Sequence, residues 1–281
     1  MSRIDLHTHT TFSDGSFSPT ALVDLATQQG LDILAITDHD TTEGLAEAQE
    51  ATKGLSMELI PGIELSAQFQ NREMHILGYF INPTDPHFQA RLETHRTTRI
   101  GRLHQILDRL QALGMDISLA EVELASGTGT IGRPHIAQVL IDKGYIKTMK
   151  DAFEQLLGSR GKAYVPRIVP EAHEIIEWIT DAGGIPILAH PYWEGYNKED
   201  SATACQTLVE QGLRGLEVFY GTFSARHISF NLGLAKRFEL LMTGGSDFHG
   251  TLKPDITLGK GKGSLHVPSK LVEQLRIAAG Q

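Results

Sequence analysis

The first residues of this chain that point to chemistry are His7 and His9, two histidines separated by one residue. The surrounding segment 4–9 reads Ile-Asp-Leu-His-Thr-His, and this alternation is typical of a β-strand. Because residues two apart in a strand share a face, the two imidazoles project side by side. We predict that they form half of a metal site.

Other imidazole and carboxylate side chains follow short apolar runs that look like strands. For example, the run 33–36 leads to His39, and the run 240–243 leads to Asp247 and His249. Side chains at the carboxyl ends of parallel strands meet at one end of an α/β sheet, so we expect all such donors to converge. The nine candidate metal ligands are His7, His9, Asp14, His39, Glu64, His75, His190, Asp247 and His249.

This donor set contains nitrogen and oxygen atoms but no thiolate. It suits Mn²⁺, Zn²⁺ or Fe²⁺ better than a structural zinc ion, which prefers cysteine. Nine donors exceed what one ion needs, so we expect two or three ions that share a carboxylate. Such a cluster serves hydrolysis by making hydroxide near neutral pH. The remaining histidines follow no strand beside another donor and are interpreted as surface or core residues; they are His87, His95, His104, His173, His227 and His266.

The elements that must position these donors alternate between apolar runs and helical patterns. From residue 1 to about 82, and again from about 170, βα units repeat, which predicts a parallel sheet with right-handed crossovers. The position of the donors after the apolar runs favours closure of that sheet into a barrel. With 281 residues, 41% of them hydrophobic, the chain is long enough for one such barrel.

The strand signal disappears between residues 88 and 165, where one long helical pattern precedes three shorter ones. Ser118 and Glu121 predict a helix-capping box there. Residues 91–170 hold 12 basic and 8 acidic residues, although the whole chain has a net charge of −9. We predict a metal-binding barrel of residues 1–87 and 166–281, and a helical insertion, 88–165, that covers the active site and contributes substrate contacts.

Composition also limits where the protein works. The single cysteine, Cys205, excludes an internal disulfide bond, and no apolar stretch approaches the roughly 20 residues that span a bilayer. No export signal is visible at the N-terminus. We expect a cytoplasmic protein with neither a membrane nor an obligate protein partner.

Taken in order, these segments resemble the motifs of the PHP superfamily, named for polymerase and histidinol phosphatase. The matching segments are His7-Thr8-His9, Ser13-Asp14-Gly15, Thr37-Asp38-His39-Asp40, Gly62-Ile63-Glu64, His75, Ala189-His190-Pro191 and Ser246-Asp247-Phe248-His249. The resemblance implies an α/β fold, a distorted (β/α)₇ barrel of PHP type with an inserted helical subdomain, whose three metal ions hydrolyse phosphoesters.

The same resemblance implies how the ligands divide among the ions, for which we favour Mn²⁺ over Zn²⁺ or Fe²⁺. The first ion takes His7, His9, Glu64 and Asp247, the second Glu64, His75 and His190, and the third Asp14, His39 and His249. For catalysis we assign Asp40, which would orient a ligand or handle a proton, together with His190, Asp247 and His249.

Within the superfamily, the length, the insertion and the segment Gly132-Arg133-Pro134-His135 resemble the small phosphatases that act on nucleoside 3′,5′-bisphosphates. This resemblance implies a phosphoric monoester hydrolase that removes the 3′-phosphate, for example from adenosine 3′,5′-bisphosphate to give AMP, by hydroxide that the metal ions activate. A nucleotide with two phosphates is therefore the expected substrate.

The phosphate that does not react needs cationic donors. Arg99 and Arg102 lie three residues apart on one predicted helix face, with Gly101 leaving room for a phosphate, and guanidinium groups bind phosphate bidentately. Arg133 and His135 lie at the start of the next helix, where backbone N–H groups also favour an anion. We predict that these four side chains bind the substrate.

Three alternatives remain open on the sequence alone. The first is a 5′-3′ exoribonuclease that trims short RNA with the same site, as relatives of those phosphatases do. The second is a metal-dependent amidohydrolase, which also begins with His-x-His on a first barrel strand. The third is a metal-stabilised module that binds nucleic acid without catalysis. The segment Thr37-Asp38-His39-Asp40 and the basic insertion favour a phosphoester over a C–N bond, and the complete ligand set favours catalysis.

Overall fold

The computed structural model describes residues 3–126, 131–166, 168–193 and 197–281. The chain divides into two compact units. A barrel unit comprises Met1–Arg91 and Pro170–Gln281, and a helical unit comprises Leu92–Val169. Each unit has its own hydrophobic core.

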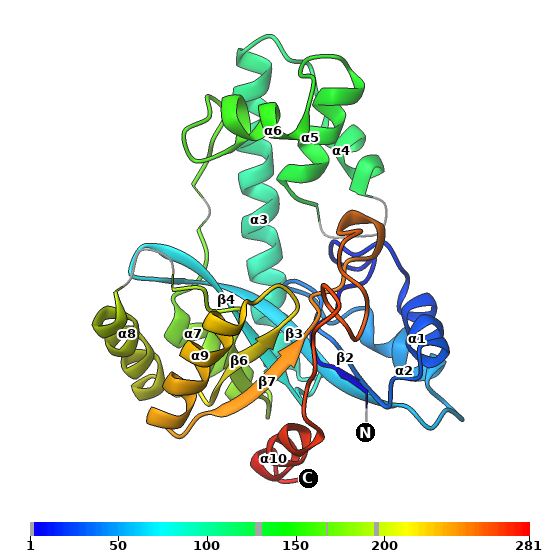
Figure 1. The fold of residues 1–281 in the computed structure, drawn as a ribbon. Coiled ribbons are helices and arrows are strands. Elements are labelled where there is room, and N and C mark those ends of the chain that lie inside the picture. The colour runs from blue at the N-terminus through cyan, green and yellow to red at the C-terminus, as the bar shows by residue number, and fades with distance from the viewer. Residues whose placement is uncertain (1–2, 127–130, 167, 194–196) are drawn as a thin grey trace. The chain divides into compact units, whose positions relative to one another are not determined.

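One sheet of seven strands, arranged in chain order, forms the barrel unit (Figure 1). The backbone N–H of Leu6 donates to the carbonyl of Gly244 at 3.3 Å, so the first and last strands come together and nearly close the sheet. This confirms the predicted α/β fold with a seven-stranded barrel. The strands are β1 (Ile4–Asp5), β2 (Ile33–Ile36), β3 (Glu58–Phe69), β4 (Arg72–Tyr79), β5 (Ile185–Leu188), β6 (Gly215–Tyr220) and β7 (Leu241–Gly245).

The prediction of an entirely parallel sheet is wrong for β3 and β4. These strands form an antiparallel hairpin, and β4 is also antiparallel to β5. Gln70 and Asn71 connect the hairpin with φ values of 50° and 61°, the left-handed conformation that a two-residue hairpin turn needs. As a result, Glu64 and His75 lie within their strands and not at carboxyl ends.

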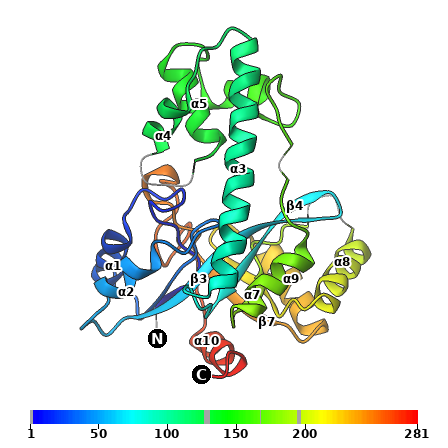
Figure 2. The same cartoon turned by 180° about the vertical axis from the view of Figure 1, so that it is seen from behind.

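Helices cover the outside of the sheet. The first begins as its sequence predicts, with the hydroxyl of Ser18 accepting the N–H of Ala21 at 3.2 Å and Pro19 in the first turn. Figure 2 shows α7 from behind, where it packs against β3, β4 and β5. The helices of the barrel unit are α1 (Pro19–Gln28), α2 (Leu45–Ala51), α7 (Ala172–Asp181), α8 (Lys198–Glu210), α9 (Ala225–Arg237), the 3₁₀ turn η2 (Gly250–Leu252) and α10 (Ser269–Ala278).

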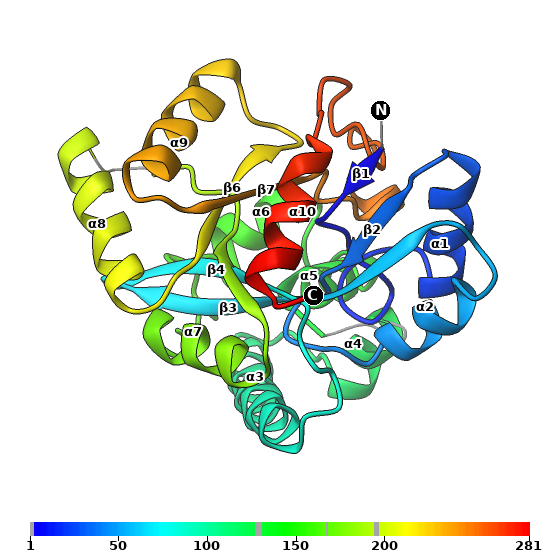
Figure 3. The ribbon, with the colours of Figure 1, turned by 90° about the horizontal axis from the view of Figure 1, so that it is seen from below.

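The last helix, α10, lies across one end of the barrel (Figure 3). Its buried Leu271, Val272 and Leu275 join a core cluster with Ile4 and Ile33 from the first residues of β1 and β2. Burial of several aliphatic side chains, at about 1.5–3 kcal/mol each, holds this end closed. The polar donors described below therefore gather toward the other ends of the parallel strands.

In the helical unit, α3 supplies the main apolar face. Its Leu103, Ile106 and Leu110 pack with Ile136 and Leu140 of α5. The predicted capping box is present, since the N–H of Ser118 donates to Glu121 at 2.8 Å. The elements are α3 (Pro86–Ala112), which begins in the barrel unit, α4 (Leu119–Ser126), α5 (Arg133–Asp142), α6 (Met149–Ala152) and the π-helical turn η1 (Phe153–Leu157). In the described part of the chain, no helix combines the length and apolar character needed to cross a bilayer.

Candidate metal centre

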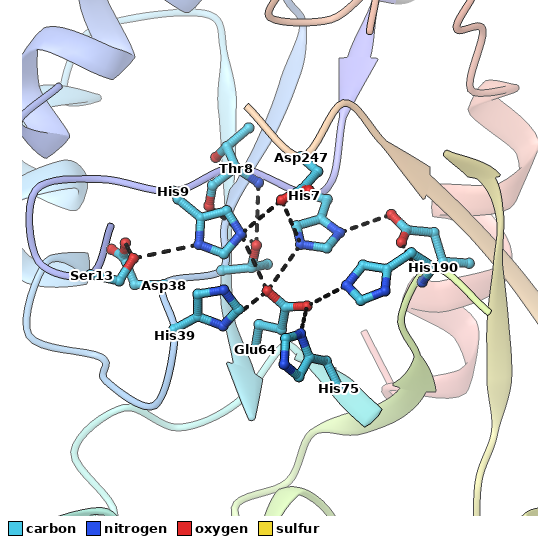
Figure 4. Close-up of polar contacts among 12 residues, drawn as sticks. His7, Thr8, His9, Ser13, Asp38, His39, Glu64, His75, His190 and Asp247 are labelled. Carbon is cyan, nitrogen blue, oxygen red and sulfur yellow. Dashed lines mark hydrogen bonds and ion pairs between the residues drawn. The ribbon is translucent and has the colours of Figure 1, made fainter. Parts of the chain in front are cut away.

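Glu64 of β3 is fully buried, and histidine side chains surround it on several sides (Figure 4). Five imidazole nitrogens lie 2.9–3.2 Å from its two carboxylate oxygens. Those of His7, His9 and His39 face Oε2, and those of His75 and His190 face Oε1. One carboxylate thus joins donors from four other segments of the barrel.

Two further carboxylates extend the cluster. Asp247 Oδ1 lies 3.2 Å from His9 Nε2 and 3.4 Å from His249 Nδ1. Asp14 Oδ1 lies 3.2 Å from His249 Nε2, and its Oδ2 lies 3.9 Å from His39 Nε2. The structure therefore brings all nine predicted donors together. β1 is shorter than predicted, but the chain beyond it stays extended and the rings of His7 and His9 lie 5.2 Å apart.

Within this cluster, four groups of side chains each have ligand atoms within 4.8 Å of one another. His9 Nε2 and Asp14 Oδ1 are buried and make no hydrogen bond with the described residues. Burying such atoms without a partner is costly, so a missing partner between them is the simplest explanation. Imidazole and carboxylate donors with an unmet partner fit divalent cations. The four groups are His9, Asp14, His39 and His249; His7, Glu64 and His190; His7, His9 and Asp247; and His39, Glu64 and His75.

The electrostatics of the cluster agree with a cation site. Burial lowers the pKa of His39 to about 3 and keeps its imidazole neutral, the form that binds metals. Burial opposes ionisation of Asp14, but the neighbouring imidazoles of His39 and His249 hold its pKa below the usual range. The carboxylates of Asp247 and Glu64 outweigh burial at His9 and raise its pKa to about 9. The carboxylates around His9 therefore favour a positive charge at this position.

Glu217 of β6 is a buried carboxylate that sequence analysis missed. Its Oε1 lies 3.0 Å from His7 Nδ1, and its Oε2 accepts the backbone N–H of His190 at 2.8 Å. The first contact directs His7 Nε2 toward Glu64, which is the usual way a carboxylate orients a metal-ligating histidine. An acidic residue inside the apolar strand Gly-Leu-Glu-Val-Phe-Tyr was the signal available for finding it.

Tyr220 and Lys253 are two further missed residues, and both contact Asp247. The phenol of Tyr220 donates to Oδ2 at 2.6 Å, and the ammonium of Lys253 lies 2.7 Å from the same atom. Burial and the adjacent carboxylate of Asp247 raise the pKa of Tyr220, so its phenol remains a donor. Asp247 has one oxygen facing the histidines and one held by these two groups.

Buried aspartates hold the loops that carry the ligands. Asp38 accepts the N–H of Thr10 at 2.7 Å and the hydroxyl of Ser13, which fixes the loop between His9 and Asp14. Asp5 accepts the N–H of Ser246 at 2.8 Å, next to Asp247. These contacts explain why loop residues can form a precise site.

Asp40, predicted as catalytic, lies beside the cluster but belongs to none of the four donor groups. Its Oδ1 accepts the backbone N–H of Ser66 at 2.9 Å, and its own N–H donates to the carbonyl of Glu64. Asp40, His190 and Asp247 have φ values of 57°, 29° and 57°, which are strained for residues other than glycine. Strain of this kind persists where surrounding contacts fix the backbone, as the contacts to Ser66 and Glu217 do.

The structure places the four predicted substrate-binding residues together within the helical unit. Arg99, Arg102 and Arg133 line a hollow of about 130 Å³ at the start of α5. Arg99 Nε donates to the carbonyl of Ile131 at 2.9 Å, close to the N-terminal residue of the helix. His135 Nδ1 accepts the N–H of Gly132 at 3.0 Å, so this ring caps the helix.

Several known proteins are similar to this chain in sequence and fold. Over 247 residues the chain is 34% identical to a 5′-3′ exoribonuclease of Haemophilus influenzae, covering 88% of this chain and 90% of the relative. It is 32% identical over 258 residues to a 3′,5′-nucleoside bisphosphate phosphatase of Chromobacterium violaceum, covering 89% and 88%. A Bifidobacterium adolescentis structure described as a metal-dependent phosphoesterase superimposes with a TM-score of 0.85 and 33% identity, covering 98% of this chain and 96% of that one.

The family model for the PHP domain matches residues 5–184. That range includes six of the nine donors, up to His75. Since the match covers more than half of the chain and the full-length relatives share about a third of its residues, the chain belongs to the PHP domain family.

Proposed function

We propose that this protein is a metal-dependent phosphoesterase that removes the 3′-phosphate of nucleoside 3′,5′-bisphosphates. The observation that carries the proposal is the buried carboxylate of Glu64 with five imidazole nitrogens within 3.2 Å, flanked by Asp14 and Asp247. Imidazole and carboxylate donors that share one buried carboxylate in this way suit a group of divalent cations.

We assign three divalent ions to the cluster, with Mn²⁺ favoured by its imidazole and carboxylate donors. When bound, such ions lower the pKa of water toward neutrality and offset the negative charge of a phosphoryl group. His7, His9, Glu64 and Asp247 would hold the first ion, Glu64, His75 and His190 the second, and Asp14, His39 and His249 the third, an assignment supported by the contacts within each set.

The side chains themselves set the geometry of the reaction. Glu217 fixes His7 and His190, while Tyr220 and Lys253 hold Asp247. Lys253, whose side chain is 43% exposed, also supplies a positive charge that a phosphate entering the site can approach. These contacts place the ligands before substrate binds, which is how an active site avoids reorganisation during the reaction.

For the phosphate that is not hydrolysed we propose the hollow lined by Arg99, Arg102 and Arg133. Guanidinium forks and the N-terminus of α5 are complementary to a phosphate dianion. His135 contributes by capping that helix, with its ring 3.0 Å from the N–H of Gly132.

A 5′-3′ exoribonuclease is the second candidate function, and the relative from Haemophilus influenzae that bears this name favours it. Both reactions break the bond between phosphorus and the 3′-oxygen of a nucleotide that carries a 5′-phosphate. They differ only in whether the reacting phosphate is terminal, as in the bisphosphate, or is esterified to the next nucleotide, as in RNA. One site can therefore serve both.

A substrate panel tests the proposal. We expect phosphate release from adenosine 3′,5′-bisphosphate to give AMP, with the 5′-phosphate retained. The panel includes nucleoside 3′-monophosphates, 5′-phosphorylated RNA oligomers and amide substrates. Equal turnover of monophosphates lacking the second phosphate would contradict the bisphosphate specificity, and cleavage of C–N bonds alone would replace the proposal with an amidohydrolase.

Replacement of Arg99 or Arg102 by Ala tests the second-phosphate contact. We expect kcat/KM for the bisphosphate to fall about tenfold, equivalent to about 1.4 kcal/mol of transition-state binding. The bound metal is expected to stay unchanged, and turnover of a monophosphate to fall little. Lys147→Ala, an exposed basic residue of the same unit, is the matched control. An equal loss for both substrates would contradict the assignment.

A further inference from the structure

A groove of about 740 Å³ in the barrel unit is lined by residues from the start of α8 and from α9. Three cationic side chains and three large aromatic ones line it, and no carboxylate is among its described lining residues. This is unusual in a chain whose net charge is −9. The cationic residues are Lys198, Arg226 and Arg237, and the aromatic ones are Tyr192, Trp193 and Phe230.

The groove continues toward the metal centre. A second pocket of about 420 Å³ is lined by the metal-ligand candidates His75 and His190, and it shares Tyr192 and Trp193 with the groove. Ring contacts follow the same path, from His190 to Tyr220 at 5.3 Å and from Tyr220 to Tyr192 at 6.2 Å. A ligand that extends from the metal centre into the groove therefore passes Tyr192 and Trp193 first.

Hydrogen bonds hold the aromatic segment in place. Trp193 Nε1 donates to Asn231 Oδ1 at 2.9 Å, and Asn231 Nδ2 donates to the carbonyl of Pro191 at 3.1 Å. Asn231, a residue of α9, is 1% exposed, so the side chain that makes both hydrogen bonds is buried. Tyr192, which is 39% exposed, has its hydroxyl 2.6 Å from that of Thr222. Aromatic rings held this way keep their positions without a ligand, which lowers the entropy cost of binding one.

Cationic side chains beside accessible aromatic rings are the features that bind single-stranded nucleic acid. The cations attract the phosphates, and the rings stack on bases regardless of sequence. A mononucleotide bound at the metal centre has no part that needs this groove. We propose that the groove between α8 and α9 binds the nucleotides of a single-stranded RNA that follow the 5′-terminal nucleotide in the metal centre.

This inference rests on the second candidate function, the 5′-3′ exoribonuclease, for the scissile bond, and it deepens that function by assigning where the following nucleotides bind. The 5′ end of the RNA lies at the metal centre, and the chain runs in the 3′ direction past Tyr192 and Trp193 into the groove. His227, interpreted from the sequence as an ordinary surface or core residue, also lines this groove, with its ring 5.3 Å from that of Tyr192.

Binding of RNA to the metal-loaded protein tests the groove directly. The probe is a 5′-phosphorylated hexaribonucleotide with phosphorothioate linkages and a 3′ fluorophore, and fluorescence anisotropy gives the Kd. We expect Arg226→Glu to raise the Kd about tenfold and to reduce its dependence on salt, and Phe230→Ala to raise it about fivefold or more. Lys270→Glu, an equally exposed charge reversal on α10, controls for overall charge.

Hydrolysis provides the second measurement. For the wild-type protein we expect kcat/KM to increase from a dinucleotide to a hexanucleotide, and in the groove variants this increase disappears while turnover of adenosine 3′,5′-bisphosphate stays at the wild-type value. Arg226 is exposed, so its variant tests the groove even if Phe230→Ala fails to fold.

The outcomes separate the two proposals. Weaker RNA binding in the groove variants alone supports the groove even if no phosphoester is hydrolysed. Unchanged binding in Arg226→Glu, or an equal loss in Lys270→Glu, overturns the groove even if the bisphosphate is a good substrate.

Discussion

Replacement of Glu64 by Gln is expected to lower kcat/KM for the bisphosphate by at least about a thousandfold and to remove bound metal. The reason is its position, since five imidazole nitrogens approach its two oxygens at 2.9–3.2 Å. An amide keeps one carbonyl oxygen but presents an NH₂ group to the other side and carries no negative charge. Metal content by elemental analysis and phosphate release are the two measurements.

Glu273→Gln is the control for Glu64→Gln, because Glu273 is an exposed residue of α10 and the substitution makes the same chemical change. Its metal content and activity are expected to equal those of the wild type. If Glu64→Gln kept its full metal complement and its activity, the carboxylate would be a structural residue and the metal centre as described here would be wrong.

Replacement of Glu217 by Gln is expected to weaken metal binding and activity by about 10- to 100-fold. Glu217 accepts two hydrogen bonds in the structure, one at each oxygen, from His7 Nδ1 and from the backbone of His190. Glutamine has one acceptor oxygen, so its NH₂ group must face one of these two donors. Metal affinity, measured by titration of the metal-free protein, reports on this effect directly.

A loss of activity in Glu217→Gln with an unchanged metal affinity would contradict the positioning role. A loss of folding would appear as a lower Tm, and Tyr79→Phe then serves as a comparison. Its hydroxyl donates at 2.8 Å to the backbone carbonyl of Leu6 rather than to a metal-ligand side chain, so its variant is expected to lose stability and keep metal affinity.

The donors of the metal centre were predictable because their residue types are unusual at strand ends. Histidine pairs such as His7 and His9, and the segment Ser246-Asp247-Phe248-His249, are rarely found next to apolar runs for structural reasons alone. Their convergence followed from the βα repeat, which places the ends of parallel strands at the same edge. The seven-stranded α/β fold was predictable for the same reason.

The direction of β4 was not predictable from the pattern of apolar residues. Alternation of side chains is the same in parallel and antiparallel strands, and the turn at Gln70 and Asn71 lacks the glycine that usually marks a two-residue hairpin. The consequence is local, because the hairpin still brings Glu64 and His75 together, with Glu64 Oε1 3.0 Å from His75 Nδ1.

Supporting residues were missed for a different reason. Glu217, Tyr220 and Lys253 are ordinary residue types in a strand or a loop, and only the folded chain shows that they contact His7 and Asp247. The groove was missed likewise. Its cations, at positions 198, 226 and 237, are spread over 40 residues, whereas the basic excess of residues 91–170 is visible in the sequence.

The near closure of the barrel between Leu6 and Gly244 has a consequence for how the protein folds. The ligands extend from His7 to His249, so a complete set exists only after the two ends of the chain have met. Contacts this distant in sequence form slowly, because the loop-closure entropy is lost before they contribute any energy. The complete metal site therefore forms only after the rate-limiting transition state of folding. Metal ions are expected to prolong the lifetime of the folded protein by slowing its unfolding, while leaving the rate of folding nearly unchanged.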